Sequence, residues 1–210
     1  MPNTIPASRF NVLASKESIG KAMNSLEAND IKAYIVETGK EAKEKALSLI
    51  PEGSEVMTMT SVTLDSLGIS EAINKSGKYN SARSKLNSMN KETQKQEMNK
   101  LGSAPIYSIG SVHAISKKGE IIIASNTGSQ LPAYAYGSEH VIFVVSTAKI
   151  VENLEEGFKR VYEYSLPLES ERAKKAYGVE GSSVNKILII NKEAFPGRIS
   201  VIFVNESLGF

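Results

Sequence analysis

Residues 141–146 (VIFVVS) form the most apolar run of the chain, and this run constrains the fold more than any other feature. A strand that is buried on both faces, as in the middle of a parallel sheet, reads as a continuous apolar segment rather than an alternating one. The run is also far shorter than the ~20 residues that a membrane span requires. We therefore expect residues 141–146 to be a central parallel strand.

Strand-like and helix-like segments alternate around this run. Residues 32–37 (KAYIVE) and 55–59 (EVMTM) are β-prone, and residues 41–50 between them carry apolar side chains at helical spacing. Further strands are expected at 106–109, 112–116, 120–124, 186–190 and 199–204, and further helices at 152–164 and 169–177. This alternation favours an α/β fold, a mainly parallel sheet flanked by helices with right-handed crossovers.

The length of 210 residues suits one sizeable core, so we expect a single domain over residues 1–210. An N-terminal helical segment is expected at about 12–30, with Ile19, Ala22, Met23 and Leu26 on its buried face. Residues 79–101 are rich in Lys, Gln, Asn, Ser and Glu. They predict a polar helical excursion, either a plain surface feature or a mobile flap.

Composition excludes several classes of function. The 25 basic and 23 acidic residues give a formal net charge of +2, too small an excess to indicate a nucleic-acid partner. The chain has no cysteine, so it cannot carry a disulfide, a thiolate zinc site, an iron–sulfur cluster or a cysteine nucleophile. With two histidines in addition, neither a metal site nor a bound cofactor is expected within this chain.

The location of the protein is predicted from the same features. Residues 1–11 contain no apolar run behind a basic segment, so they do not read as a signal peptide. A chain without cysteine also suits a reducing compartment. We expect a cytoplasmic protein that does not enter a membrane.

Hydroxyl side chains follow the strand expected at 55–59. Thr60, Ser61 and Thr63 lie where that strand ends and a helix begins. In open α/β sheets ligands collect beyond the carboxyl ends of the strands, and the start of a helix attracts anions. These residues are therefore candidates for an anion site, although Ser61 or Thr63 would serve equally well as a helix cap.

A second polar loop follows the strand expected at 120–124. It contains Asn126, Thr127, Gly128 and Ser129, and its glycine permits a close approach of the backbone to a ligand. The loop lacks both the Gly-Lys-Ser/Thr of a phosphate-binding loop and the dinucleotide fingerprint. It is either a carboxylate or phosphate site or a tight polar turn.

Two cations are candidates for meeting a substrate carboxylate. Lys149 follows the apolar strand, and Arg198 opens the last one. An arginine can bind a carboxylate through two parallel hydrogen bonds. In the alternative interpretation Lys149 is a solvated residue at the start of the next helix, and Arg198 pairs with Glu206 or Asp65.

His113 is one of two histidines and shares a strand face with Ser111. It is a candidate general base or ligand contact, and Ser111 a candidate ligand contact. No acidic residue nearby completes a catalytic triad. A hydrogen-bonded, partly buried histidine is the alternative.

Five phrases in this order resemble the LUD family, named for bacterial lactate utilisation, and in particular its LutC-like members. They are residues 60–68 (TSVTLDSLG), 110–115 (GSVHAI), 124–130 (ASNTGSQ), 149–151 (KIV) and 196–210 (PGRISVIFVNESLGF). The resemblance covers residues from about 56 to 210. It implies a fold similar to the sugar-isomerase and CoA-transferase-like (NagB/RpiA) superfamily.

The resemblance also implies a role in the oxidation of L-lactate to pyruvate, beside partner proteins that carry iron–sulfur clusters. Some family members have a cysteine-rich motif before the last strands, whereas residues 177–185 (YGVEGSSVN) contain none. A cluster that the pathway requires would therefore lie on another chain.

Three functions remain open on the sequence. The first is a LutC-like protein that binds a small anionic metabolite at the strand-end loops. The second is a non-catalytic accessory subunit of a lactate-oxidising complex, with residues 79–100 as a contact surface and a homo-oligomer as a further possibility. The third, by analogy of fold alone, is an isomerase or acyl transferase with Glu120 as its reactive carboxylate.

Overall fold

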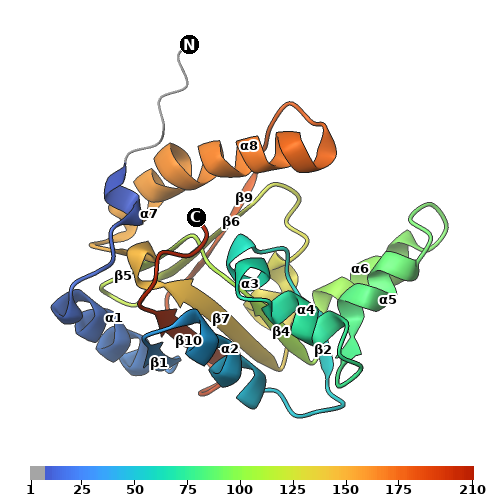
Figure 1. The fold of residues 1–210 in the computed structure, drawn as a ribbon, viewed down its shortest axis with the longest axis horizontal. Helices are drawn as coiled ribbons and strands as arrows, with labels where there is room; N and C mark the ends of the chain where they lie inside the picture. Colours follow the sequence, from blue (N-terminus) through green and yellow to red (C-terminus); the bar gives the residue numbers. More distant parts are fainter. Residues whose placement is uncertain (1–7) are drawn as a thin grey trace.

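The computed structural model describes residues 8–210 and contains two β-sheets (Figure 1). Residues 1–7 lie outside the residues that the structure describes. The prediction that residues 1–11 are not a signal peptide falls mainly on them. The main sheet has six parallel strands in the order β1-β10-β7-β4-β2-β3. The small sheet has four strands in the order β8-β5-β6-β9 and is largely antiparallel.

The main-sheet strands are β1 (Lys32–Val36), β10 (Ile199–Val204), β7 (His140–Ser146), β4 (Tyr107–Gly110), β2 (Glu55–Thr58) and β3 (Asn80–Ser81). The small-sheet strands are β8 (Ile150–Val151), β5 (Ala114–Ser116), β6 (Ile121–Ser125) and β9 (Lys186–Ile190). The α-helices of the first half are α1 (Lys16–Ala28), α2 (Gly39–Ser48), α3 (Val62–Ser66) and α4 (Ile69–Asn74). Those that follow are α5 (Ala82–Ser88), α6 (Lys95–Ser103), α7 (Leu154–Arg160) and α8 (Leu166–Tyr177).

Alternate residues of the main strands build two separate cores. Val141, Phe143 and Val145 of β7 face α1, α5 and the small sheet. Ile142 and Val144 face the other way, toward α2, α3 and α4. β7 has neighbours on both edges and both faces, which explains its continuous apolar sequence and confirms the central parallel strand.

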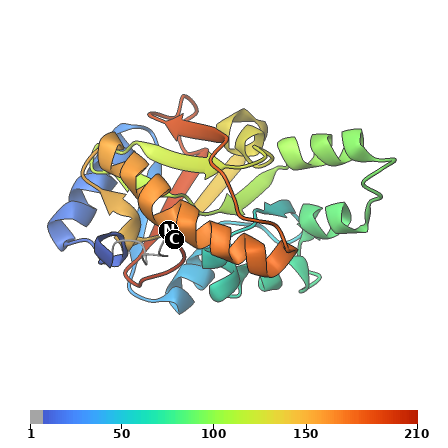
Figure 2. The ribbon, with the colours of Figure 1, turned by 90° about the horizontal axis from the view of Figure 1, so that it is seen from above.

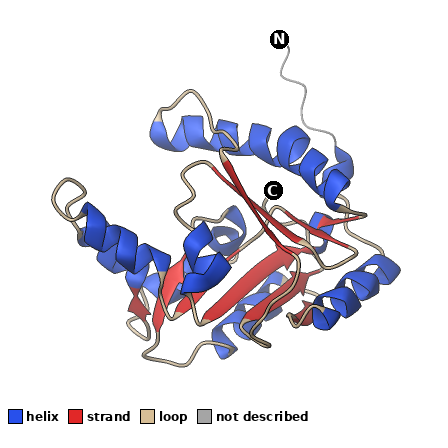
Figure 3. Ribbon diagram, turned by 180° about the vertical axis from the view of Figure 1, so that it is seen from behind, coloured by secondary structure: helices blue, strands red, loops and turns tan. Residues whose placement is uncertain are grey.

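The small sheet adds a further layer beneath α7 and α8. Ile121 and Ile123 of β6 join the core under the main sheet. Ile122 and Ala124, on the opposite face of β6, pack with Val161, which follows α7. Figures 2 and 3 show α8 lying across this outer side of the molecule.

Helices α5 and α6 form an arm that projects from the body (Figures 1 and 2). Ala82 and Leu86 of α5 are buried, whereas α6 has no buried residue. The arm covers most of residues 79–101, for which the sequence predicts a polar helical excursion, and extends two residues beyond them.

Two details differ from the sequence-based expectations. β9 and β10 are consecutive strands but belong to different sheets. The helical spacing of residues 152–164 predicts one helix with Leu154, Phe158, Val161 and Tyr162 on its buried side. The structure instead has α7 followed by a π-helical segment, η4 (Val161–Ser165), and Tyr162 is 49% exposed. A π-helical turn contains more residues than an α-helical one, so the buried positions shift along the sequence. Within residues 8–210 no helix is both long and apolar enough to cross a membrane.

Candidate functional site

The carboxyl ends of β2, β4, β7 and β10 meet at one edge of the main sheet because these strands are parallel. Thr60 and Ser61 follow β2, Ser111 follows β4, Thr147 follows β7 and Asn205 follows β10. This edge is where α/β sheets of this kind bind ligands. Of the candidates taken from the sequence, Thr60, Ser61, Thr63, Ser111 and Lys149 lie along it.

Ser61 caps α3, since its Oγ accepts a hydrogen bond from the Leu64 N–H at 3.3 Å. Thr63 is buried, whereas Thr60 is exposed. The five-residue helix α3 is too short for its N-terminus alone to make an anion site. The capping interpretation therefore holds for Ser61, and Thr63 is the residue of this loop that reaches the interior.

Lys149 lies at the centre of this edge and is 2% exposed. Its Nζ lies 3.1 Å from the carbonyl oxygen of Val112 and 3.2 Å from Ser111 Oγ. An oxygen of Phe210, the last residue of the sequence, lies 3.1 Å away, and Thr63 Oγ1 is at 3.5 Å. We call these residues the Lys149 cluster. The alternative of a solvated lysine is wrong, because the short 3-10 helix η3 (Thr147–Lys149) turns the side chain inward.

Burial lowers the pKa of Lys149 well below its ordinary value, and the nearby positive charge of Arg160 lowers it further. Three neighbours of Nζ are the hydroxyls of Thr63 and Ser111 and the carbonyl oxygen of Val112, and the fourth is an oxygen of Phe210, the last residue of the sequence. Within residues 8–210 no Asp or Glu side chain forms an ion pair with Lys149.

His113 is held as part of the scaffold. Its Nδ1 accepts a hydrogen bond from the Ala124 N–H at 3.1 Å, which ties β5 to β6. Burial, together with the positive charges of Lys149 and Arg160, lowers the pKa of His113 to about 3. A ring with its Nδ1 occupied and so low a pKa is poorly suited to general-base catalysis at neutral pH. The structure therefore favours the hydrogen-bonded alternative.

The loop with Asn126, Thr127, Gly128 and Ser129 lies beside the start of β9. Asn126 Oδ1 accepts from Asn185 Nδ2 at 2.8 Å, and the Gly128 N–H donates to Ser125 Oγ at 2.8 Å. Thr127 Oγ1 donates a hydrogen bond to Ser129 Oγ at 3.1 Å. In the described chain no hydrogen bond links this loop to the Lys149 cluster, so its contacts are those of a polar turn.

Arg198 does not join the site, because it precedes β10 and so lies at the amino edge of the main sheet. Its Nε donates to Glu193 Oε2 at 2.8 Å, and both side chains are less than 10% exposed. Its Nη atoms donate to the carbonyl oxygens of Tyr134 and Ser138. Arg198 lies apart from the Lys149 cluster and lines a hollow at the opposite edge of the sheet, and its ion-pair partner is Glu193 rather than Glu206 or Asp65.

Glu120 is likewise structural, because its carboxylate accepts a hydrogen bond from Ser116 Oγ within the turn between β5 and β6. This contact occupies the carboxylate that the acyl-transferase interpretation requires.

Sequence reasoning missed Arg160, a 1% exposed residue at the end of α7. Its Nη1 donates to the carbonyl oxygen of His113 and to Ser165 Oγ, and its Nη2 lies 3.4 Å from the carbonyl oxygen of Phe10. The sequence offered one signal for the burial of Arg160, namely its place directly before Val161, which lies on the apolar side of the predicted helix.

Residues 205–210 cover the Lys149 cluster. Ser146 Oγ donates to the carbonyl oxygen of Glu206, and a Glu206 carboxylate oxygen accepts from the Gly39 N–H at 3.1 Å. A Cβ at Gly209 would lie 2.3 Å from Thr63 Oγ1. The segment therefore packs closely over the cluster and supplies the Phe210 oxygen to Lys149.

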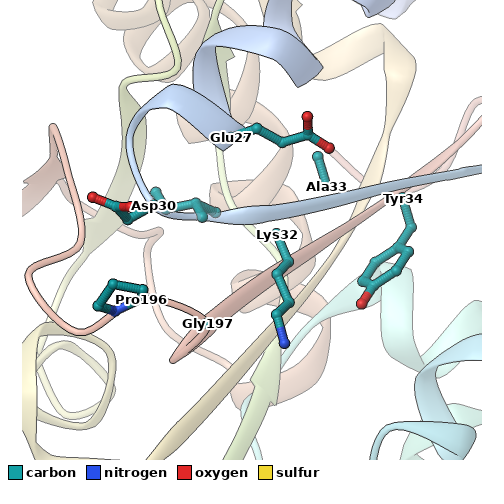
Figure 4. Close-up of a pocket in the computed structure, with 8 residues that line it drawn as sticks. Glu27, Asp30, Lys32, Ala33, Tyr34, Pro196 and Gly197 are labelled. Atoms are coloured by element: carbon teal, nitrogen blue, oxygen red, sulfur yellow. The ribbon is translucent and has the colours of Figure 1, made fainter.

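Two open hollows occupy the opposite edge of the main sheet. One, of about 380 Å³, is lined by polar side chains of Glu27, Asp30, Lys32 and Tyr34 together with Pro196 and Gly197 (Figure 4). The other, of about 630 Å³, includes Tyr136 and Phe195. Both border strand starts, and neither is lined by a residue of the Lys149 cluster.

Comparisons with known proteins bear on this arrangement. The fold is similar to that of a DUF162 family protein from Deinococcus radiodurans, with a TM-score of 0.56 and 12% identity over 92% of this chain and 100% of that chain. Ribose 5 phosphate isomerase A from Neisseria gonorrhoeae gives a TM-score of 0.35 and 17% identity over 55% of this chain and 54% of that one, too low to support an argument. No curated protein matches the sequence. The LUD domain model matches residues 19–204, and the chain therefore belongs to the LUD domain family.

Proposed function

We propose that this protein takes part in lactate utilisation as a LutC-like protein, in the oxidation of L-lactate to pyruvate, and binds a small anionic metabolite at Lys149. Membership of the LUD domain family supports the pathway. The observation that carries the binding site is the buried Lys149 amine at the carboxyl edge of a parallel sheet, with hydroxyl and main-chain oxygens around it.

The surroundings of Lys149 suit a carboxylate. A carboxylate oxygen of a ligand that takes the place of the Phe210 oxygen would receive a charge-assisted hydrogen bond from the protonated Lys149 amine. The hydroxyls of Ser111 and Thr63 stand beside the same amine and can donate to a second oxygen. Thr60 and Ser61 belong to the same strand end and complete the proposed pocket.

Binding at this amine should be coupled to proton uptake. The pKa of Lys149 is lowered mainly by burial, and an anion beside Nζ favours the charged form. Affinity for the anion should therefore fall as the pH rises. Calorimetry of lactate or pyruvate binding in buffers of different ionisation enthalpy measures this proton directly.

Thermal unfolding with lactate and with pyruvate tests the proposal. At one hundred times its dissociation constant a ligand stabilises the protein by ~2.7 kcal/mol, and Lys149→Met should lose this response. Lys118→Met, at an exposed position in the turn between β5 and β6, is the matched control and should keep it. Absence of any response in the wild type, or an equal response in Lys149→Met, would reject the site.

A second candidate function is a non-catalytic accessory subunit that binds iron–sulfur partner proteins. The arm favours it, because the arm projects from the body and α6 has no buried residue (Figure 2). Deletion of residues 90–94, between α5 and α6, should weaken co-purification with such partners and leave the small-molecule response intact. A monomer that turns over lactate without a partner would exclude this candidate.

A further inference from the structure

Two exposed aromatic side chains line the same hollow at the amino edge of the main sheet. Tyr136 is 81% exposed and Phe195 is 60% exposed, and both belong to the hollow of about 630 Å³. This volume falls in the range of small-molecule sites, which are lined by aromatic side chains and a few polar groups. Large apolar side chains that gather in one place on a surface mark a binding site, whereas scattered ones do not.

A π-helical segment, η2 (Ala133–Gly137), separates the surroundings of its two tyrosines. Tyr134 is 1% exposed, and its ring packs edge-on against Phe143 with the ring centroids 4.8 Å apart. Tyr136, two residues later, lines the hollow instead. π-Helical turns are rare and occur frequently at functional sites. This one anchors one ring in the core and leaves the other exposed at the hollow.

Arg198 braces the end of η2 that carries Tyr136. Its Nη2 donates to the carbonyl oxygens of Tyr134 at 2.7 Å and Ala135 at 3.3 Å. Its Nη1 donates to the carbonyl oxygen of Ser138 at 2.9 Å. Carbonyl groups at the end of a helix have no partner within the helix, and Arg198 supplies their donors.

Glu193, the ion-pair partner of Arg198, braces the second aromatic residue. Its Oε2 accepts from Arg198 Nε at 2.8 Å, and its Oε1 accepts from the Phe195 N–H at 3.0 Å. The Arg198 N–H in turn donates to the carbonyl oxygen of Phe195 at 3.1 Å. A buried ion pair is costly to desolvate, and this one holds both segments that present an aromatic ring to the hollow.

Lys32 adds a positive charge to the lining. It lines both hollows together with Pro196 and Gly197, so the two hollows adjoin at this residue. Figure 4 shows its side chain beside Gly197, and a Cβ at Gly197 would lie 3.3 Å from Lys32 Nζ. Lys32 is exposed, and within residues 8–210 no carboxylate forms an ion pair with it. Its amine is therefore available to an anionic group.

We propose that this hollow binds a small molecule that joins a planar aromatic ring to an anionic group. The ring packs against Tyr136 and Phe195, and the anionic group pairs with Lys32. Glu139, in the same lining, can accept a hydrogen bond from an N–H group of the ring. A mononucleotide and an indole carboxylic acid share this chemistry. The site lies at the opposite edge of the sheet from Lys149, so it goes beyond the proposed function and does not depend on it.

Calorimetry with two sets of probes tests the site. AMP and indole-3-acetate each carry a ring and an anionic group. Adenosine and indole carry the ring alone, and ribose 5-phosphate and acetate carry the anionic group alone. At least one complete probe should bind about tenfold more tightly than either of its parts, because it makes both contacts. The set that contains this probe distinguishes a nucleotide from an aryl carboxylate.

Variants with matched controls assign the contacts. Phe195→Ala and Tyr136→Ala should each weaken binding of the complete probe about tenfold, because each removes a surface on which the ring stacks. Lys32→Met should reduce its affinity to that of the ring-only part and leave the ring-only affinity unchanged. Tyr177→Ala and Lys118→Met remove an exposed ring and an exposed amine outside both hollows, and they should change nothing. All five side chains are exposed, so these variants should fold.

Three results would overturn the site. They are no binding of either complete probe, equal affinity for a complete probe and its ring-only part, and binding that survives in the double variant Phe195→Ala with Tyr136→Ala. The lactate response that depends on Lys149 should be the same in this double variant as in the wild type. Its absence in both proteins would reject the proposed function and leave the amino-edge site in place.

Discussion

The Nζ of Lys149 lies 3.1 Å from the carbonyl oxygen of Val112, a residue 37 positions earlier in the chain. This contact joins the end of β7 to the end of β4, two strands that are neighbours in the main sheet. It fixes an amine in the interior at the edge where ligands of parallel α/β sheets bind. Its protonation is therefore linked to the stability of the fold.

The stability of the protein should rise with pH on the alkaline side because of Lys149. Its pKa is lowered in the folded state, so the unfolded chain binds more protons between that lowered pKa and the ordinary value of 10.5. The free energy of unfolding should increase in this window by up to about 1.4 kcal/mol per pH unit. Urea unfolding at several pH values measures the slope.

Lys149→Met should lose this alkaline slope, whereas Lys118→Met should retain it. A slope that is identical in wild type and Lys149→Met would show that the amine does not stay buried. A slope of the opposite sign would show that its pKa is raised rather than lowered.

The Arg198–Glu193 pair should matter for stability and not for lactate binding. Both side chains are buried, and Arg198 also bonds two main-chain carbonyl oxygens. Arg198→Ala leaves the buried Glu193 carboxylate without its ion-pair partner, with only the Phe195 N–H still donating to it, and should cost about 3–5 kcal/mol of unfolding free energy. Chemical denaturation measures the loss, and the lactate response should persist wherever the variant is folded.

Arg172→Ala is the matched control for this pair. Arg172 and Glu169 are considerably more exposed than Arg198 and Glu193. Arg172→Ala should therefore lower the free energy of unfolding by only about 0–1 kcal/mol. Equal costs for the two variants would contradict the structural role assigned to Arg198.

Gly110, the last residue of β4, should not tolerate a side chain. A Cβ there would lie 1.8 Å from Tyr134 Oη and 3.0 Å from its Cζ. Gly110→Ala should therefore destabilise by about 1–3 kcal/mol, and the double variant with Tyr134→Phe should recover part of the loss. Thermal and urea unfolding give both values.

Gly20 in α1 provides the opposite case, since a Cβ there meets nothing within 4 Å. Gly20→Ala should stabilise by about 0.5–1 kcal/mol because alanine is the better helix former. Destabilisation by Gly20→Ala, or none by Gly110→Ala, would contradict the packing described around these two glycines.

Much of the fold follows from periodicity in the sequence. The continuous apolar run of β7 predicts its central place, and Ile19, Ala22 and Leu26 mark the buried face of α1. The sheet to which β9 belongs was not predictable, because pairing depends on contacts between distant segments. The exposure of Tyr162 depends on a π-helical turn that leaves no periodic signature.

The candidate site was predictable only in part, and for a related reason. The position of Lys149 after a buried strand indicates the ligand-binding edge. The direction of its side chain, however, depends on the 3-10 helix η3 that contains it. The place of Arg198 stayed open because the sequence does not reveal at which edge of the sheet a strand begins. Arg160 was missed because its acceptors come from His113, Ser165 and Phe10, one of them 150 positions away.

The strand order has a consequence for how the protein is made. β10 pairs with both β1 and β7, so Lys32 meets Ser200 in register. During translation β1 therefore has no strand to pair with until β10, near the end of the domain, has been synthesised. Long-range parallel pairing of this kind is slow and leaves strand edges exposed to other nascent chains. Pulse-labelled hydrogen exchange during refolding should show β1 and β10 becoming protected together, and earlier protection of β1 alone would contradict this order.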